Sequence, residues 1–219
     1  MSVTEQRTPA RRYGGVSASD RVAARRERLL DAALELYGTR GYVATGVKDI
    51  CREAGLTDRY FYESFRNSEE LFTAAFDRAT DDLLRLVERR VAEAGQGPEA
   101  QVRAAIEAFV RALADDPRKA QLIFLERASA GVEAERHMRG ALRRFAALVA
   151  ATARPHLRKG VPDRVLKMGA LSLVGAIERL MIDWQDGEID ATIDQVIDYL
   201  VGFFLAAGAS IGVSRRQRR

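Results

Sequence analysis

The sequence contains few residues that bind metals or form covalent cross-links. It has one cysteine, Cys51, and two histidines, His137 and His156, in 219 residues. A single cysteine excludes a disulfide framework, and these three residues lie too far apart for a zinc-finger pattern. We therefore expect no metal site and no cofactor. Cys51 is either a redox-sensing thiol or a small buried apolar side chain, and the second role is the more common one.

Long apolar runs and prolines are also scarce. No apolar run reaches the roughly 18 residues that a membrane-spanning helix needs, and the arginine-bearing N-terminus lacks the apolar segment of a signal peptide. We expect a cytoplasmic protein that does not enter a membrane. The chain is 47% hydrophobic and 30% charged and has only 5 prolines, which is typical of a folded, helical protein. These features predict an all-α fold.

The net charge of +4 is distributed unevenly along the chain. Residues 1–30 contain seven arginines against three acidic residues, and residues 215–219 contain four arginines and no acidic residue. We assign residues 1–21 to a basic arm and residues 214–219 to a basic tail. Such ends are either solvated tails or contacts to a polyanion such as DNA. The arginines of the arm would suit the minor groove of DNA.

Three helices are expected after the arm. Apolar residues recur at helical spacing over residues 22–37, and two glycines then end that helix. Thr45 is predicted to cap a short helix that ends at Gly55, and Thr57 to cap a second short helix. Two short helices joined by a glycine-containing turn are typical of a helix-turn-helix, which we place at residues 45–64.

The second short helix carries Arg59, Tyr60 and Tyr62 within one turn. A helix buried in a core rarely contains three large polar-tipped side chains so close together, so we expect these residues to face outward. This pattern strengthens the prediction of a helix-turn-helix over that of an ordinary helical hairpin.

Further helices are predicted after residue 95, separated by glycine and proline, at residues 99–115, 118–131, 133–153, 163–185 and 190–212. The last two helices are apolar on almost every side, and residues 199–213 contain no charged residue. Such helices must be buried on all sides. A homodimer interface formed by these two helices is the favoured explanation. The alternatives are an ordinary core and a membrane segment, for which 15 residues are too few.

The segment "LLDAALELYGTRGYVATGVKDICREAGLTDRYFYESFRNSEELF" resembles the DNA-binding domain of tetracycline-repressor (TetR) type transcription regulators. The resemblance covers about 45 contiguous residues, whereas the rest of the chain agrees only in architecture. The matching positions are Ala33, Leu36, Gly41, Thr45, Val47, Ile50, Ala54, Gly55, Thr57, Tyr62, Phe65 and Leu71. The resemblance implies an all-helical homodimer, with a DNA-binding domain at residues 22–82 and an effector-binding and dimerisation domain at residues 83–213.

The resemblance also implies roles for individual residues. The second short helix would enter the major groove of double-stranded DNA, where Arg59 is suited to pair with a guanine edge. Hydroxyl and guanidinium groups near the helix ends would contact phosphates. The candidate DNA-binding residues are Thr45, Thr57, Arg59, Tyr60, Tyr62 and Arg66.

An effector pocket is implied between residues 99 and 185, for a small molecule whose binding releases DNA. An aromatic and methionine-rich lining would suit an apolar molecule. The same side chains would also serve as plain core. The candidate lining residues are Phe109, Phe124, Met138, Phe145, Met181 and Trp184.

The predicted function is that of a ligand-responsive transcription regulator, and a repressor in particular. An enzyme is not expected, because the chain contains none of the sequences GxGxxG, GxxxxGKS, HExxH or GxSxG. The alternative is a helical scaffold or interaction protein that does not bind specific DNA sequences.

Overall fold

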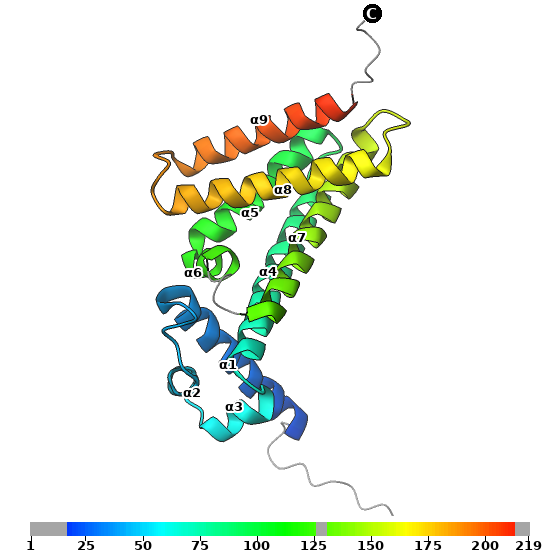
Figure 1. The fold of residues 1–219 in the computed structure, drawn as a ribbon. Coiled ribbons are helices and arrows are strands. Elements are labelled where there is room, and N and C mark those ends of the chain that lie inside the picture. Colours follow the sequence, from blue (N-terminus) through cyan, green and yellow to red (C-terminus); the bar gives the residue numbers. More distant parts are fainter. Residues whose placement is uncertain (1–16, 126–130, 213–219) are drawn as a thin grey trace, which may run out of the picture.

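The computed structural model describes residues 17–125 and 131–212, and these residues form helices and connecting turns without a strand. The predicted all-α fold is confirmed. Helices α1 to α3 form one end of the molecule, and α8 and α9 lie side by side across the opposite end (Figure 1). Helices α4, α5 and α7 fill the space between the two ends.

The first three helices are α1 (Ala18–Arg40), α2 (Val47–Ala54) and α3 (Asp58–Ser64). Helix α1 begins earlier than predicted because Ser17 caps it: the Ser17 hydroxyl accepts from the Asp20 amide, and the Asp20 carboxylate accepts from the Ser17 amide. The basic arm is therefore shorter than predicted, and its remaining residues, 1–16, lie outside the described residues, as does the tail at 214–219.

Helix α4 (Ser68–Glu93) links the two ends of the molecule. The Asn67 side chain caps it by accepting from the Glu70 amide at 2.8 Å. The predicted domain boundary at residues 82 and 83 falls inside this continuous helix. Aromatic side chains at its start, Phe72 and Phe76, pack in the same core as Tyr37 and Phe61 of the N-terminal helices. The start of α4 therefore packs in one core with the N-terminal helices, chiefly against α1.

The middle of the chain forms α5 (Pro98–Asp115), α6 (Pro117–Ala120), the π-helical turn η1 (Gln121–Leu125), α7 (Gly131–Ala153) and the 3-10 turn η3 (Arg154–His156). Prolines at the first positions of α5 and α6 explain why both helices begin one residue before the predicted starts at residues 99 and 118. The prediction of one helix over residues 118–131 is wrong, because α6 ends at Ala120 and π-helical hydrogen bonding follows.

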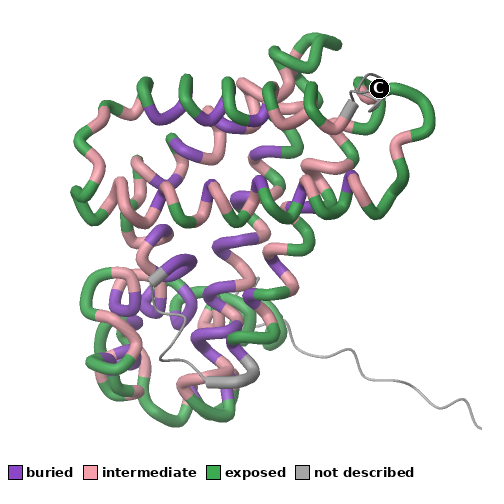
Figure 2. Tube along the Cα trace, turned by 45° about the horizontal axis from the view of Figure 1, so that its top comes forward, coloured by how far each residue is buried: buried purple, intermediate pink, exposed green. Residues whose placement is uncertain are grey.

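The last two helices are α8 (Asp163–Gln185) and α9 (Ile193–Gly212). In both helices buried residues recur at helical spacing with exposed residues between them (Figure 2). The exposed faces contain large apolar side chains: Met168 and Leu171 on α8, and Tyr199 and Phe203 on α9. The single chain therefore covers only part of the apolar surface of these helices.

Helix α9 also has the length and composition of a membrane span over Ile193–Ile211, so the sequence argument that it is too short is wrong. Such a helix is weak evidence for a membrane, because apolar helices of soluble proteins meet the same criterion. Two ion pairs connect α9 to α5, from Arg111 to Asp194 at 2.7 Å and from Arg103 to Asp198 at 2.9 Å. These contacts place the start of α9 against the protein.

Candidate DNA-binding interface and effector cavity

Helices α2 and α3 form a helix-turn-helix with a three-residue turn. Gly55 closes α2 in the left-handed conformation, with φ of +60°, which favours glycine. Thr57 is the N-cap residue of α3, as predicted, although its side chain makes no capping hydrogen bond. Phe61 is the single residue of α3 that is fully buried, so it anchors the helix and leaves the other side chains to face outward.

Four of the six predicted DNA-binding residues are exposed on α3 or immediately beside it: Thr57, Arg59, Tyr62 and Arg66. The exposed fraction is 84% for the Arg59 side chain, 88% for the Arg66 side chain and 61% for Tyr62. A large aromatic residue exposed to this degree contributes little to the core. These four residues are therefore accessible to a partner as large as a DNA duplex.

Tyr60 is half-buried, and Arg25, for which no local sequence signal indicates this role, holds it in place. The guanidinium carbon of Arg25, on α1, lies 4.5 Å from the centre of the Tyr60 ring, a cation–π contact. Arg25 also lies 3.7 Å from a carboxylate oxygen of Glu63, and the other oxygen of Glu63 accepts from Arg59 Nε at 3.0 Å. Glu63 therefore orients Arg59, and both arginines share its negative charge.

The predicted role of Thr45 is wrong. Gly46, and not Thr45, is the N-cap residue of α2. Thr45 is only 6% exposed, and its hydroxyl donates to the Gly41 carbonyl at 2.8 Å. The hydroxyl is satisfied inside the loop before α2, so it is not available to a phosphate.

Two other arginines of α1 are used to hold the helix-turn-helix together. Arg28 donates to the carbonyls of Ala54 and Gly55 at the end of α2, and Arg26 donates to the Ser64 carbonyl at the end of α3 at 3.0 Å. Cations at these positions satisfy carbonyls that have no partner within the helix. Part of the positive charge near the N-terminus therefore stabilises the ends of α2 and α3.

Cys51 is 3% exposed in α2, which favours the apolar role over the redox one. Burial, together with the nearby Asp58 carboxylate, raises the pKa of its thiol to about 11. We expect a thiol reagent at about pH 8 to modify the folded protein very slowly and the unfolded protein at once, because the thiolate is the reactive form. Absorbance of the released reagent, with guanidinium-unfolded protein as the control, measures this. Rapid reaction of the native protein would contradict the assignment.

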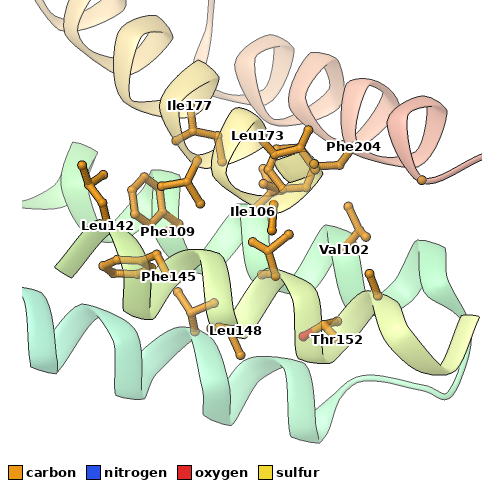
Figure 3. Close-up of a pocket in the computed structure, with 18 of the residues that line it drawn as sticks. Val102, Ile106, Phe109, Leu142, Phe145, Leu148, Thr152, Leu173, Ile177 and Phe204 are labelled. Carbon is orange, nitrogen blue, oxygen red and sulfur yellow. The ribbon is translucent and has the colours of Figure 1, made fainter. Parts of the chain in front are cut away.

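A cavity of about 510 Å³ lies between α4, α5, η1, α7, α8 and α9. Its wall is almost entirely aliphatic and aromatic. Figure 3 shows Leu142, Phe145 and Leu148 along α7, with Leu173 and Ile177 of α8 on the opposite side. This volume is typical of a pocket for a small molecule.

Four of the six predicted lining residues do line the cavity: Phe109, Phe124, Met138 and Phe145. The predictions for Met181 and Trp184 are wrong. Met181 is completely buried in the core, and the Trp184 indole donates to the Ala191 carbonyl at 2.8 Å in the turn before α9. Both follow the part of α8 that borders the cavity, which ends at Glu178.

Sequence reasoning missed the aliphatic lining of the cavity. Val102 and Ile106 of α5 and Phe204 of α9 also reach it (Figure 3). Their helical spacing is the same as that of ordinary core residues, so the pattern alone does not distinguish cavity from core.

Three comparisons agree with this architecture. Residues 29–75 match the model of the bacterial regulatory proteins, tetR family. The HTH-type transcriptional activator FasR of Mycolicibacterium smegmatis is 33% identical over 125 residues, which span 56% of this chain and 57% of that protein. The match thus spans little more than half of the relative's length.

Two solved structures share the fold. The fatty acid degradation regulator FadR of Bacillus halodurans superposes with a TM-score of 0.71 over 82% of this chain and 97% of that chain, at 18% identity. FadR of Bacillus subtilis, solved in complex with stearoyl-CoA, superposes with a TM-score of 0.72 over 83% and 98% of the two chains, at 17% identity. The match over residues 29–75 shows that this chain contains the domain of the bacterial regulatory proteins of the tetR family, and the superpositions show that it shares the fold of the two FadR structures.

Proposed function

We propose that this protein is a cytoplasmic transcription regulator, and not an enzyme, that binds a palindromic operator as a homodimer and is released by a small molecule. The observation that carries the proposal is the surface of α3, where Arg59 and Tyr62 are exposed above the buried anchor Phe61. An α3 placed in the major groove would bring Arg59 to the edge of a guanine, with which a guanidinium pairs bidentately. Thr57 and Arg66 would contact phosphates on either side.

The exposed apolar faces of α8 and α9 support the homodimer. Tyr199 and Phe203 are 63% and 39% exposed, and their rings are nearly parallel with centroids 6.3 Å apart. Met168 on α8 is 65% exposed. A second copy of the chain would cover these side chains with its own α8 and α9 in a four-helix arrangement. Such a dimer would present two copies of α3 to half-sites about 34–36 Å apart.

The cavity is the proposed effector site. Its wall of apolar side chains favours a ligand with a large apolar part, and the Bacillus subtilis FadR structure holds stearoyl-CoA in the same fold. We propose that an apolar small molecule occupies the cavity and favours a protein conformation in which the two copies of α3 no longer fit adjacent half-sites.

Helix α4 offers one way in which ligand binding in the cavity could change the position of the DNA-binding surface. Phe76, Leu83 and Val87 of α4 line the cavity, and the preceding turn of the helix packs against α1. Polar contacts fix α7 to α4, among them Arg144 to Asp81, and the His137 ring to Asp77 at 2.7 Å. A ligand that moves α7 would therefore also move α4.

Helix α6 offers a second route. Ile123 and Phe124 of η1 line the cavity, and α6 directly precedes them. Arg118 of α6 pairs with Glu35 of α1 at 2.7 Å. A methyl group added at Gly38 of α1 would lie 2.5 Å from the Arg118 Cβ, so the two helices are in close contact. A ligand that displaces η1 would therefore also displace α6 and, through it, the end of α1.

A mobility-shift assay with DNA from upstream of the protein's own and neighbouring genes tests the function. We expect saturable binding to a palindromic fragment that persists against excess unrelated DNA and is lost when one half-site is scrambled. Binding that is indifferent to sequence and vanishes at moderate salt would support a basic helical scaffold instead.

We propose that the protein is a repressor and that the bound dimer blocks transcription. The relative FasR is by name an activator, so a separate measurement must distinguish repression from activation. A reporter gene placed behind the operator should become more active when the regulator is deleted. Lower reporter activity after deletion would contradict repression while leaving the DNA-binding function intact.

A further inference from the structure

The exposed face of α3 is centred on two side chains of opposite charge. At about 100° per residue, Arg59 and Glu63 each lie about 160° around the helix axis from Phe61, the buried anchor. They are therefore the two residues of α3 that point most directly away from the core. An α3 placed in a groove of DNA would bring both toward the base edges, so the presence of a carboxylate there requires an explanation.

Helix stability and attraction to DNA do not account for Glu63. It lies one residue before the end of α3, where the helix dipole is unfavourable for a carboxylate. DNA phosphates would repel it as well. Its ion pair with Arg59 joins residues four apart on an exposed helix surface, and such pairs contribute little to stability. The role of Glu63 therefore lies in the group that it holds.

The Glu63 carboxylate holds the Arg59 guanidinium by one nitrogen. Arg59 Nε donates to Oε1 of Glu63 at 3.0 Å. Within residues 17–125 and 131–212, Nη1 and Nη2 of Arg59 make no hydrogen bond, so their N–H groups are left for a partner. Guanine presents two acceptors, O6 and N7, which match a pair of guanidinium N–H groups. The contact with Glu63 therefore restrains Arg59 and leaves its terminal nitrogens available to a base.

A second arginine restrains the carboxylate itself. Oε2 of Glu63 lies 3.7 Å from Nη2 of Arg25 on α1, and α3 lies beside α1 (Figure 1). The Arg25 guanidinium also lies over the Tyr60 ring. The Arg25 side chain is only 23% exposed, so it has less freedom than an arginine on the surface. Arg25 thus holds Glu63 from the side of α1, while Glu63 holds Arg59.

The surface around α3 carries little unpaired arginine charge. Arg52 of α2 is paired with Asp49, and Arg66 is paired with Glu70 at 3.0 Å. Arg59 is thus one of three arginines here whose charge is partly neutralised by a carboxylate. Neutralised arginines attract phosphates less strongly, so binding to DNA of any sequence is weakened. Contacts to bases then have a larger share in the affinity.

We propose that Glu63 is a positioning residue that sets sequence specificity, because it orients Arg59 toward a base edge and keeps that arginine from binding a phosphate instead. The inference rests on the proposed function and names a residue that controls the specificity of its DNA-binding surface. An exposed arginine without such a partner samples many rotamers and loses that freedom on binding a guanine. It also pairs readily with phosphates. Glu63 thereby favours the base contact over the backbone contact.

The affinity of the full-length protein for its operator, and for operators in which each guanine is replaced in both half-sites, tests this role. Glu63→Ala should lower the ratio of the two affinities by about fivefold or more at the guanine that Arg59→Ala identifies, because a bidentate contact discriminates by at least about this factor. Binding to unrelated DNA should become tighter, since a carboxylate near the phosphates is lost. Glu63→Gln keeps an acceptor for Nε and should retain part of the ratio.

The matched control is Glu53→Ala. Glu53 is an exposed acidic residue of α2 that lies outside the contact with Arg59. This variant removes the same charge from the helix-turn-helix, so it should also tighten binding to unrelated DNA. It should leave the ratio at the guanine within about twofold of the wild-type value, and neither variant should change the melting temperature much. An equal fall of the ratio in both variants would overturn the positioning role.

A double-mutant cycle distinguishes positioning from direct reading, since a carboxylate can itself accept from the N4 amino group of cytosine. In the Arg59→Ala background, Glu63→Ala should change the ratio little further. Additive losses, or loss of a cytosine preference alone, would overturn the proposal. An unchanged preference in Glu63→Ala, with specific binding by the wild type, would overturn only the positioning role. Absence of specific binding by the wild-type protein would overturn the proposed function as well.

Discussion

Replacing Arg59 by alanine should weaken operator binding by about 2–6 kcal/mol, which corresponds to roughly 30-fold to more than 10,000-fold. A bidentate arginine–guanine contact contributes about 1–3 kcal/mol, and a homodimer makes it twice. The side chain is 84% exposed, so the melting temperature should change little. Fluorescence anisotropy with a labelled operator and thermal unfolding of the same samples measure the two effects.

Three further variants make the Arg59 experiment specific. Arg59→Lys keeps the charge but not the bidentate geometry, so it should retain binding to unrelated DNA while losing discrimination between sequences. Tyr62→Ala should weaken operator binding without unfolding the protein. Phe61→Ala, in contrast, should lower the free energy of unfolding by about 3–5 kcal/mol, because Phe61 is completely buried. An Arg59→Ala protein that unfolds, or that binds the operator normally, would contradict the surface assigned here.

The double variant Tyr199→Glu/Phe203→Glu should convert the proposed dimer into a monomer and weaken operator binding by about 100-fold or more. Carboxylates at these positions would be buried without partners at the subunit interface, which costs several kcal/mol. Both residues are exposed in the single chain, so the monomer itself should remain folded. Sedimentation velocity and anisotropy with the operator measure mass and affinity on the same preparation.

The matched control for the dimer is Arg139→Glu. Arg139 is an exposed residue of α7, outside the surface of α8 and α9, and its replacement should leave both mass and affinity unchanged. A Tyr199→Glu/Phe203→Glu protein that still sediments as a dimer would place the interface elsewhere. A wild-type protein that is a monomer on its operator would contradict the homodimer itself.

The sequence predicts helices well where local signals determine their ends. Pro98 and Pro117 begin α5 and α6 within one residue of the predicted starts, and Gly55 closes α2. The apolar pattern does not indicate the start of α1, because the Ser17–Asp20 capping box precedes that pattern. Thr45 was misassigned because threonine suits an N-cap, whereas here its hydroxyl is satisfied by the Gly41 carbonyl four residues earlier.

Contacts between distant segments could not be predicted in this way. Arg25 reaches Tyr60 and Glu63 from α1, and nothing in the local sequence indicates that pairing. The π-helical turn η1 has no sequence signal of its own. Met181 and Met138 have the same side chain at the same apolar spacing, yet one is core and the other lines the cavity, because that difference depends on how α8 crosses α7.

Selection of bound sequences from a pool of random double-stranded DNA by the full-length protein is the most direct test of a groove-reading homodimer. We expect enrichment of an inverted repeat whose half-sites lie about one duplex turn or a multiple of it apart, with guanines that the Arg59→Ala protein no longer selects. Recovery of sequences without a repeat, with the same composition as the starting pool, would contradict it.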